Sequence, residues 1–201
     1  MRALGILAQA PIPGHVKARL AEDVGASTAA EVYQRIGREV VTAAAGSGYR
    51  TVVWYTPAEE GPFVREWLNG VGRVEFRPQG AGALAARVNH AMTVHFAEGA
   101  DRVVLIGTDC PGLNRRLVEE AFTALGSHDV ILGPAVDGGV YLFGLRHPQP
   151  SLLQAVPRAS GGLAAQLRVR ARGLGLSLTT LRPLRDVDTA TDARLLGYLN
   201  S

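Results

Sequence analysis

The sequence predicts an α/β fold of three layers, in which a mostly parallel central sheet carries helices on both faces. Short continuous apolar runs such as Val103–Ile106 are typical of strands that are buried on both sides. These runs alternate along the whole chain with segments whose apolar residues recur at helical spacing. Neither a low-complexity linker nor an internal repeat interrupts the alternation, so we expect residues 1–201 to form one domain.

The first half of the chain supplies four expected strands and two expected helices. The strands are apolar or β-branched runs at residues 3–8, 51–55, 74–77 and 103–106. Thr28 and Glu31 have the spacing of a capping box and predict a helix from there to about Ala45. A second helix is expected between the third and fourth strands, because its apolar residues fall on one helical face: Leu84, Val88, Ala91, Met92 and Phe96.

The second half continues the same alternation. A helical stripe from Leu117 to Leu125 is followed by strands at residues 130–132 and 140–145, then by a helix at 163–174 and a strand at 177–181. A last helix begins near Thr191. Asp192 stands three residues after Thr189, which is a helix-capping arrangement.

Composition excludes several classes of protein. The 201 residues are 47% hydrophobic and 19% charged, and no apolar run is long enough to span a bilayer, so no membrane partner is expected. Cys110 is the only cysteine, which rules out an intrachain disulfide and suits a cytoplasmic protein. The net charge is +3, but no aromatic residues interleave with the arginine cluster at 168–172. We therefore interpret that cluster as a solvated helix face and expect no nucleic-acid partner.

The first candidate binding segment follows the first strand. In an open α/β sheet, ligands bind beyond the carboxyl ends of the strands. Residues 9–20 stand there and contain Gly14, Lys17 and Arg19. Lysine offers phosphates a point charge, whereas arginine can hold two oxygens at once. The alternative is an exposed loop with ordinary surface cations.

A glycine-rich segment follows the third strand and contains Gln79, Gly80 and Gly82. Its pattern is similar to the Gly-x-Gly-x-x-Ala turn of dinucleotide-binding domains, but it follows the wrong strand for that fingerprint. A loop that lets a base or ribose approach the backbone explains it better, and a plain tight turn explains it equally well.

Asp109 is the strongest candidate for metal binding. It follows the buried strand at 103–106, where a divalent cation can bridge a carboxylate to phosphate oxygens. We expect Mg²⁺ or Mn²⁺ there. The alternative is that Asp109 caps the helix that begins near Asn114. We interpret the neighbouring Cys110 as a small buried residue, since no partner base is apparent.

Three further aspartates stand in acidic turns. Asp137 precedes two glycines between expected strands, and it either forms a turn or faces the substrate. Asp186 and Asp188 lie on the same side of an extended segment. We favour Asp188 as a second metal ligand, the alternative being a solvated acidic turn.

In this order, these clusters resemble a bacterial family of transferases with the GT-A fold, the nucleotide-diphospho-sugar transferase fold. Members of that family occur with radical-SAM enzymes and are described as arsenosugar-biosynthesis glycosyltransferases. The matching stretches cover nearly the whole chain: residues 13–20, 79–84, 106–113, 133–139 and 186–189. The same plan is similar, more distantly, to 2-phospho-L-lactate and molybdenum-cofactor guanylyltransferases. Ala81, Ala83, Ala85 and Val140 depart from the family pattern, which concerns base or acceptor preference more than the metal site.

The resemblance implies a magnesium-dependent site with Asp109 as metal ligand and Asp188 as its helper. Lys17 and Arg19 would hold phosphates, and residues 79–82 would lie beside the nucleoside. The expected activity is glycosyl transfer from a nucleotide-diphosphate sugar to a small acceptor, with Asp137 as a base. Nucleotidyl transfer with release of pyrophosphate is the alternative, and a non-catalytic nucleotide-binding protein is the third hypothesis.

Overall fold

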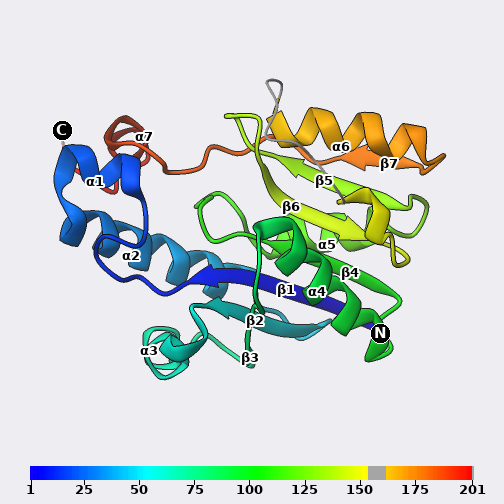
Figure 1. The fold of residues 1–201 in the computed structure, drawn as a ribbon, viewed down its shortest axis with the longest axis horizontal. Coiled ribbons are helices and arrows are strands. Elements are labelled where there is room, and N and C mark those ends of the chain that lie inside the picture. Colours follow the sequence, from blue (N-terminus) through cyan, green and yellow to red (C-terminus); the bar gives the residue numbers. More distant parts are fainter. Residues whose placement is uncertain (154–161, 201) are drawn as a thin grey trace.

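The computed structural model describes residues 1–153 and 162–200 and contains a seven-stranded sheet (Figure 1). The strands are β1 (Arg2–Gln9), β2 (Arg50–Thr56), β3 (Glu75–Pro78), β4 (Arg102–Ile106), β5 (Val130–Pro134), β6 (Val140–Leu145) and β7 (Leu178–Thr180). Their order across the sheet is β3-β2-β1-β4-β6-β5-β7. Strand β6 is antiparallel to β4 and β5, whereas the pairs β1–β2, β1–β4, β2–β3 and β5–β7 are parallel. The predicted mostly parallel α/β sheet is confirmed.

Helices cover both faces of the sheet (Figure 1). Alternate strand residues point to opposite faces, so Leu4 and Ile6 of β1 belong to one apolar core and Ala3 to the other. The first core is completed by α2 (Ala26–Ala44), α3 (Gly61–Trp67) and α5 (Arg115–Ala124). The second core is completed by α4 (Leu84–Ala97) and α6 (Gly162–Gly173). These are the expected three layers.

Helix α2 begins earlier than the sequence predicts. Its N-cap is Gly25, whose positive φ of 83° suits glycine, so Thr28 and Glu31 lie inside the helix and the predicted capping box is wrong. Helices α1 (Ala18–Val24) and α3 were not predicted, because each has only seven residues and too few apolar repeats to show a period. The last helix, α7 (Ala190–Leu195), does begin with the predicted Thr189 and Asp192 capping box.

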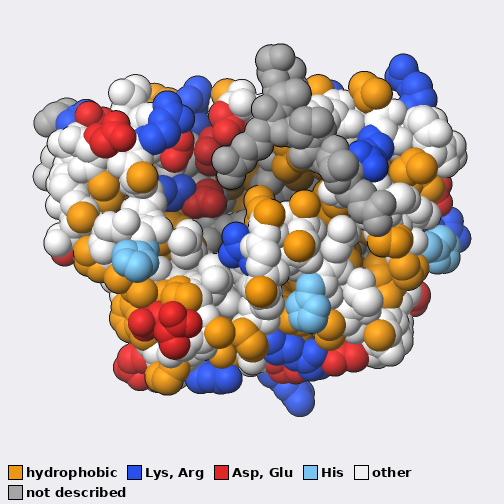
Figure 2. All heavy atoms as spheres, in the orientation of Figure 1, with side chains coloured by type: hydrophobic (Ala, Val, Ile, Leu, Met, Phe, Trp, Pro, Cys, Tyr) orange, Lys and Arg blue, Asp and Glu red, His pale blue; other side chains and the backbone are white. Residues whose placement is uncertain are grey.

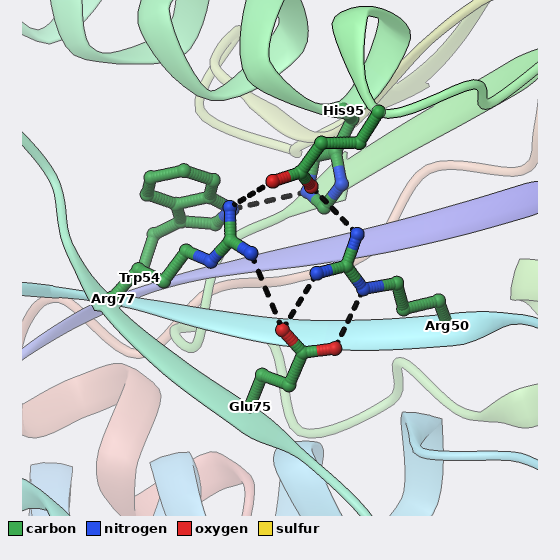
Figure 3. Close-up of polar contacts among 6 residues, drawn as sticks. Arg50, Trp54, Glu75, Arg77 and His95 are labelled. Atoms are coloured by element: carbon green, nitrogen blue, oxygen red, sulfur yellow. Dashed lines mark hydrogen bonds and ion pairs between the residues drawn. The ribbon is translucent and has the colours of Figure 1, made fainter.

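A network of ion pairs lies at the amino ends of β2 and β3 (Figure 3). Arg50 donates two hydrogen bonds of 2.6 Å to the carboxylate of Glu75 and a third, also of 2.6 Å, to Glu98. Arg77 donates to the other oxygen of Glu98 at 2.7 Å. Hydrogen bonds from the two arginines hold the pKa values of Glu75 and Glu98 below their ordinary value. At this end of the sheet the charges therefore neutralise one another.

Beside this network, His95 of α4 is buried, with only 1% of its surface exposed. Its Nε2 accepts a 3.1 Å hydrogen bond from the Trp54 indole, so the proton of the neutral ring is on Nδ1. Burial, together with the nearby positive charge of Arg50, lowers the pKa of His95 to about 4. The imidazole is therefore neutral in the folded protein throughout the physiological range.

This histidine predicts a pH dependence of stability. Because its pKa falls from 6.5 to about 4 on folding, the unfolded chain binds a proton in that interval that the folded chain does not. The free energy of unfolding should therefore decrease as the pH falls from about 6.5 to 4, by up to roughly 3 kcal/mol. Urea unfolding at half-unit pH steps measures it. His95→Gln, which cannot titrate, should show a shallower dependence in this interval; equal slopes for the two proteins would contradict the assignment.

Candidate active site

Four charged residues follow the carboxyl ends of four strands that run in the same direction. Lys17 lies after β1, Asp109 after β4, Asp137 after β5 and Asp186 after β7. Since the carboxyl ends of these strands meet at one edge of the sheet, the loops after them converge. This is the edge at which the sequence predicts ligand binding.

The three aspartates line one cavity of about 160 Å³. Asp109, Asp137 and Asp186 face it together with Cys110 and Tyr141. Figure 2 shows acidic and basic side chains lying side by side around a hollow on this face of the molecule. The cavity therefore gathers carboxylates from three separate loops.

Asp186 reaches the cavity because its segment is attached to the Asp109 loop. The backbone N–H of Val187 donates a 3.0 Å hydrogen bond to the backbone carbonyl of Asp109, and the Val187 side chain is fully buried. Asp188, on the other side of Val187, accepts a 2.7 Å hydrogen bond from Arg19. The two aspartates thus lie in different surroundings. Asp186 lines the cavity, whereas Asp188 forms an ion pair with Arg19 of α1.

Lys17 is directed at Asp109. Its side chain is only 8% exposed, and its ammonium forms an ion pair with Oδ1 of Asp109, whose side chain is 48% exposed. The Lys17 backbone is left-handed, with φ 52° and ψ 51°, a conformation that costs a residue with a side chain about 1–2 kcal/mol. Strain of this kind persists only where the surroundings fix it, and such residues cluster at functional sites.

Tyr33 of α2 lies next to the Lys17 ammonium of this ion pair. Its hydroxyl accepts a 2.9 Å hydrogen bond from the backbone N–H of Gln9 and lies 2.8 Å from Oγ1 of Thr108. The Lys17 ammonium lies 5.8 Å from the centre of its ring, within range of a cation–π contact. Burial, and secondly the charge of Asp109, raise the pKa of the Tyr33 phenol, so it stays neutral. Sequence reasoning missed Tyr33, because an aromatic residue on an apolar helical stripe looks like a core residue.

The titratable groups around the cavity differ in their proton affinity. Partial burial, and secondly the charge of Asp137, raise the pKa of Asp186 above its ordinary value. Burial also raises the pKa of the Cys110 thiol, which is 2% exposed and therefore stays protonated. The structure thus agrees with the interpretation of Cys110 as a small buried residue.

Asp137 forms a turn, which was one of the two alternatives that the sequence left open; a contact with substrate stays a prediction. Its Oδ1 accepts a 2.7 Å hydrogen bond from the backbone N–H of Gly139, which is the contact of an Asx turn. The residue nevertheless lines the cavity. The turn therefore fixes the carboxylate of a residue that lines the cavity.

Asp109 does not cap a helix. Asn114 is the N-cap of α5, where its side chain accepts a 3.3 Å hydrogen bond from the N–H of Leu117. The alternative reading of Asp109 as a helix cap is therefore excluded.

Gln79 is used within the protein. The side chain is 4% exposed, and its amide donates hydrogen bonds to the carbonyls of Ala8 (3.0 Å) and Trp54 (2.8 Å), while its oxygen accepts from Arg87. It thus joins the ends of β1 and β2. Gly80 and Gly82, which follow it, have positive φ values of 66° and 99° and lie exposed. Contact with a nucleoside remains a prediction for the backbone of these glycines.

The remaining predicted residues lie in the loop between β1 and α1. Gly14 is exposed with φ 80°, and the carbonyl of the next residue, His15, accepts a 3.0 Å hydrogen bond from the Gln9 side chain. Arg19 lies in the first turn of α1 with its side chain 69% exposed. The loop therefore brings one buried cation, Lys17, and one exposed cation, Arg19, to the same edge.

Comparison with known proteins places the chain in a family. Residues 39–160 match the family described as "Uncharacterized protein conserved in bacteria (DUF2064)". The chain belongs to this family. A solved protein of Desulfovibrio desulfuricans G20, assigned as a nucleotide-diphospho-sugar transferase, is 30% identical; the match covers 100% of this chain and 88% of that one, with a TM-score of 0.90. No curated protein matches the chain.

Two more distant structures share the fold. A cytidylyltransferase of Leptospira borgpetersenii is 16% identical with a TM-score of 0.61, over 100% of this chain and 88% of that one. A Mycobacterium tuberculosis protein in complex with manganese is 15% identical with a TM-score of 0.53, over 98% of both chains. The fold is that of the nucleotide-diphospho-sugar transferases, as predicted, and the 30% identical relative supports transferase activity. Within residues 1–153 and 162–200, no helix is both long and apolar enough to cross a membrane.

The position of Gln79 predicts a cost in stability when its amide is removed. Gln79→Met should lower the free energy of unfolding by about 1–3 kcal/mol, because the carbonyls of Ala8 and Trp54 lose their buried donor. Urea unfolding of the variant and the wild type measures the difference. Arg87→Met, which removes the third contact and spares the two carbonyls, is the matched control and should cost less. A Gln79→Met protein as stable as the wild type would contradict this structural role.

Proposed function

We propose that the protein is a divalent-metal-dependent transferase that acts on a nucleotide substrate, and that it transfers a glycosyl group from a nucleotide-diphosphate sugar to a small acceptor. The observation that carries the proposal is the convergence of Lys17, Asp109 and Asp186 beyond the carboxyl ends of β1, β4 and β7. Diphosphates need countercharge, and this edge of the sheet offers both a buried ammonium and carboxylates that suit a divalent cation.

The donor set fits magnesium or manganese. Asp109 and Asp186 present carboxylate oxygens, the ligands that these ions prefer. Among the described residues no group of three or more potential ligands is close enough to enclose an ion. That suits a site where the protein supplies one or two carboxylates and water or phosphate supplies the rest. Asp188 remains a proposed helper, and its Oδ2 is paired with Arg19. When bound, such an ion neutralises the charge that develops on the leaving diphosphate.

Lys17 and Arg19 would also neutralise charge on the leaving diphosphate. Lys17 is paired with Asp109, and Arg19 lies in the first turn of α1 and is paired with Asp188, so we propose both as ligands of phosphates at the metal site. Lys17 would act as a point charge on the oxygens and Arg19 as a two-pronged donor. Together they would stabilise the departing diphosphate in the transition state.

A carboxylate in the cavity would take the proton of the acceptor hydroxyl. Asp137 lines the cavity and is fixed by its hydrogen bond from Gly139, which makes it the proposed base. Asp186 lies close enough for its raised pKa to reflect the charge of Asp137. If Asp186 holds the metal, Asp137 is the carboxylate of this pair left for proton transfer.

Nucleotidyl transfer is the second candidate. It is favoured by the position of Lys17, because an ammonium beside the metal ligand suits the pyrophosphate that a nucleoside triphosphate releases. The resemblance to the arsenosugar-biosynthesis glycosyltransferases and the assignment of the 30% identical relative support glycosyl transfer as the first choice. A third possibility, nucleotide binding without catalysis, predicts binding with no turnover.

The metal ligand can be tested by binding. Asp109→Asn should weaken metal-dependent nucleotide binding by roughly 1–3 kcal/mol, because the neutral amide no longer attracts the cation. Calorimetry with Mg²⁺ and a panel of nucleoside diphosphates measures it. Asp101→Asn removes the same charge from the exposed partner of the Met1 ammonium and should leave binding unchanged. Equal binding by wild type and Asp109→Asn would contradict the proposed metal site.

The two reactions differ in their products. With a panel of nucleotide-diphosphate sugars and Mg²⁺ or Mn²⁺, glycosyl transfer predicts a free nucleoside diphosphate, whereas nucleotidyl transfer predicts pyrophosphate from a triphosphate such as CTP. A phosphate assay coupled to an inorganic pyrophosphatase detects the pyrophosphate, and chromatography of the nucleotides detects the nucleoside diphosphate. Binding of triphosphates but of no nucleotide sugar would rule out glycosyl transfer. Turnover that survives Asp137→Asn unchanged would remove Asp137 from the role of base.

A further inference from the structure

The contact between Lys17 and Asp109 has a consequence for the order in which ligands bind. Asp109 is the proposed metal ligand, yet in this structure its Oδ1 is already in contact with an ammonium. A divalent cation and the Lys17 ammonium need the same carboxylate. Each would therefore disfavour the other unless Lys17 has another anion to contact.

Several contacts hold Lys17 at this carboxylate. The side chain is 92% buried, so its charge is poorly solvated and depends on Asp109. Its left-handed backbone begins α1, where the carbonyl of Lys17 accepts from the N–H of Ala21. The Tyr33 ring beneath the ammonium is itself fixed by Gln9 and Thr108, at the ends of β1 and β4. Lys17 is thus a preformed neighbour of Asp109 and not a mobile surface cation.

Nearby charges give Lys17 few other partners. Asp188 is engaged by Arg19, and Asp137 by the backbone of Gly139. Asp137 and Asp186 line the same cavity, and neither has an ion pair with a cation among the described residues. A phosphate group that entered here would offer the ammonium a new anion.

We propose that Lys17 is a built-in counter-ion that competes with the divalent cation for Asp109 until nucleotide phosphates take up its ammonium. The inference rests on the proposed function, of which it specifies the regulation: metal binds weakly alone and tightly with nucleotide. The two ligands are therefore coupled through one lysine.

The test is the binding of Mn²⁺ alone, followed by electron paramagnetic resonance or calorimetry. Lys17→Met keeps most of the aliphatic stem and removes the charge, so the nucleotide-free variant should bind Mn²⁺ about tenfold more tightly than the wild type. Arg35→Met removes one positive charge from the exposed side of α2 and controls for net charge; its Mn²⁺ affinity should match the wild type. Lys17→Met combined with Asp109→Asn should lose the gain.

Nucleotide provides the second arm. CTP or UDP should raise the Mn²⁺ affinity of the wild type more than that of Lys17→Met, because only the wild type has an ammonium to release. Thermal melting verifies that each variant is folded, and Lys17→Gln serves as a replacement if Lys17→Met does not fold.

The outcomes separate the inference from the proposed function. If Lys17→Met binds Mn²⁺ no more tightly than the wild type while Asp109→Asn still weakens metal-dependent nucleotide binding, the proposed competition by Lys17 is wrong and the proposed metal site stands. If no variant binds Mn²⁺ with or without nucleotide, both are wrong. A gain that persists in the double variant also overturns the proposal, because the cation would then be bound away from Asp109.

Discussion

Lys17 and Asp109 can form an ion pair because the sheet brings the carboxyl ends of β1 and β4 together. Strands β1 and β4 are parallel neighbours, so the residues that follow them must leave the sheet at the same edge. Tyr33 then fastens the two strand ends to α2 through Gln9 and Thr108. Because these constraints come from the core, the ammonium and the carboxylate meet even though 92 residues separate them in sequence, and the strained backbone of Lys17 is tolerated.

Charged side chains are arranged differently at the two ends of the sheet. At the amino end, Arg50 and Arg77 satisfy Glu75 and Glu98, and the ion pairs shield the buried His95 and Trp54. At the carboxyl end, aspartates from three loops surround one cavity, and Asp186 has a raised pKa. The charges at the amino end thus neutralise one another, whereas at the carboxyl end Asp137 and Asp186 have no ion-pair partner among the described residues.

Most of the fold could be predicted from the spacing of apolar residues along the sequence. The apolar run Val103–Ile106 indicates a buried strand, and the apolar stripe of α5 indicates a helix. Because the strands could be located in this way, Lys17, Asp109 and Asp137 could be placed after the ends of β1, β4 and β5. Asp186 could not be separated from Asp188, because the direction of a side chain in an irregular segment is set by tertiary contacts, here the Val187 to Asp109 hydrogen bond. The start of α2 could not be predicted either. Its N-cap is Gly25 and not Thr28, and the preceding helix α1 is too short to show a hydrophobic period in the sequence.

The most direct test of the metal site is a crystal structure with Mn²⁺ and a nucleoside diphosphate, in which anomalous scattering locates the ion. We predict one manganese peak within coordination distance of the Asp109 carboxylate, phosphate oxygens on the same ion, and the Lys17 ammonium in contact with a phosphate. A nucleotide bound at this edge with manganese elsewhere, and with Lys17 still paired to Asp109, would contradict it.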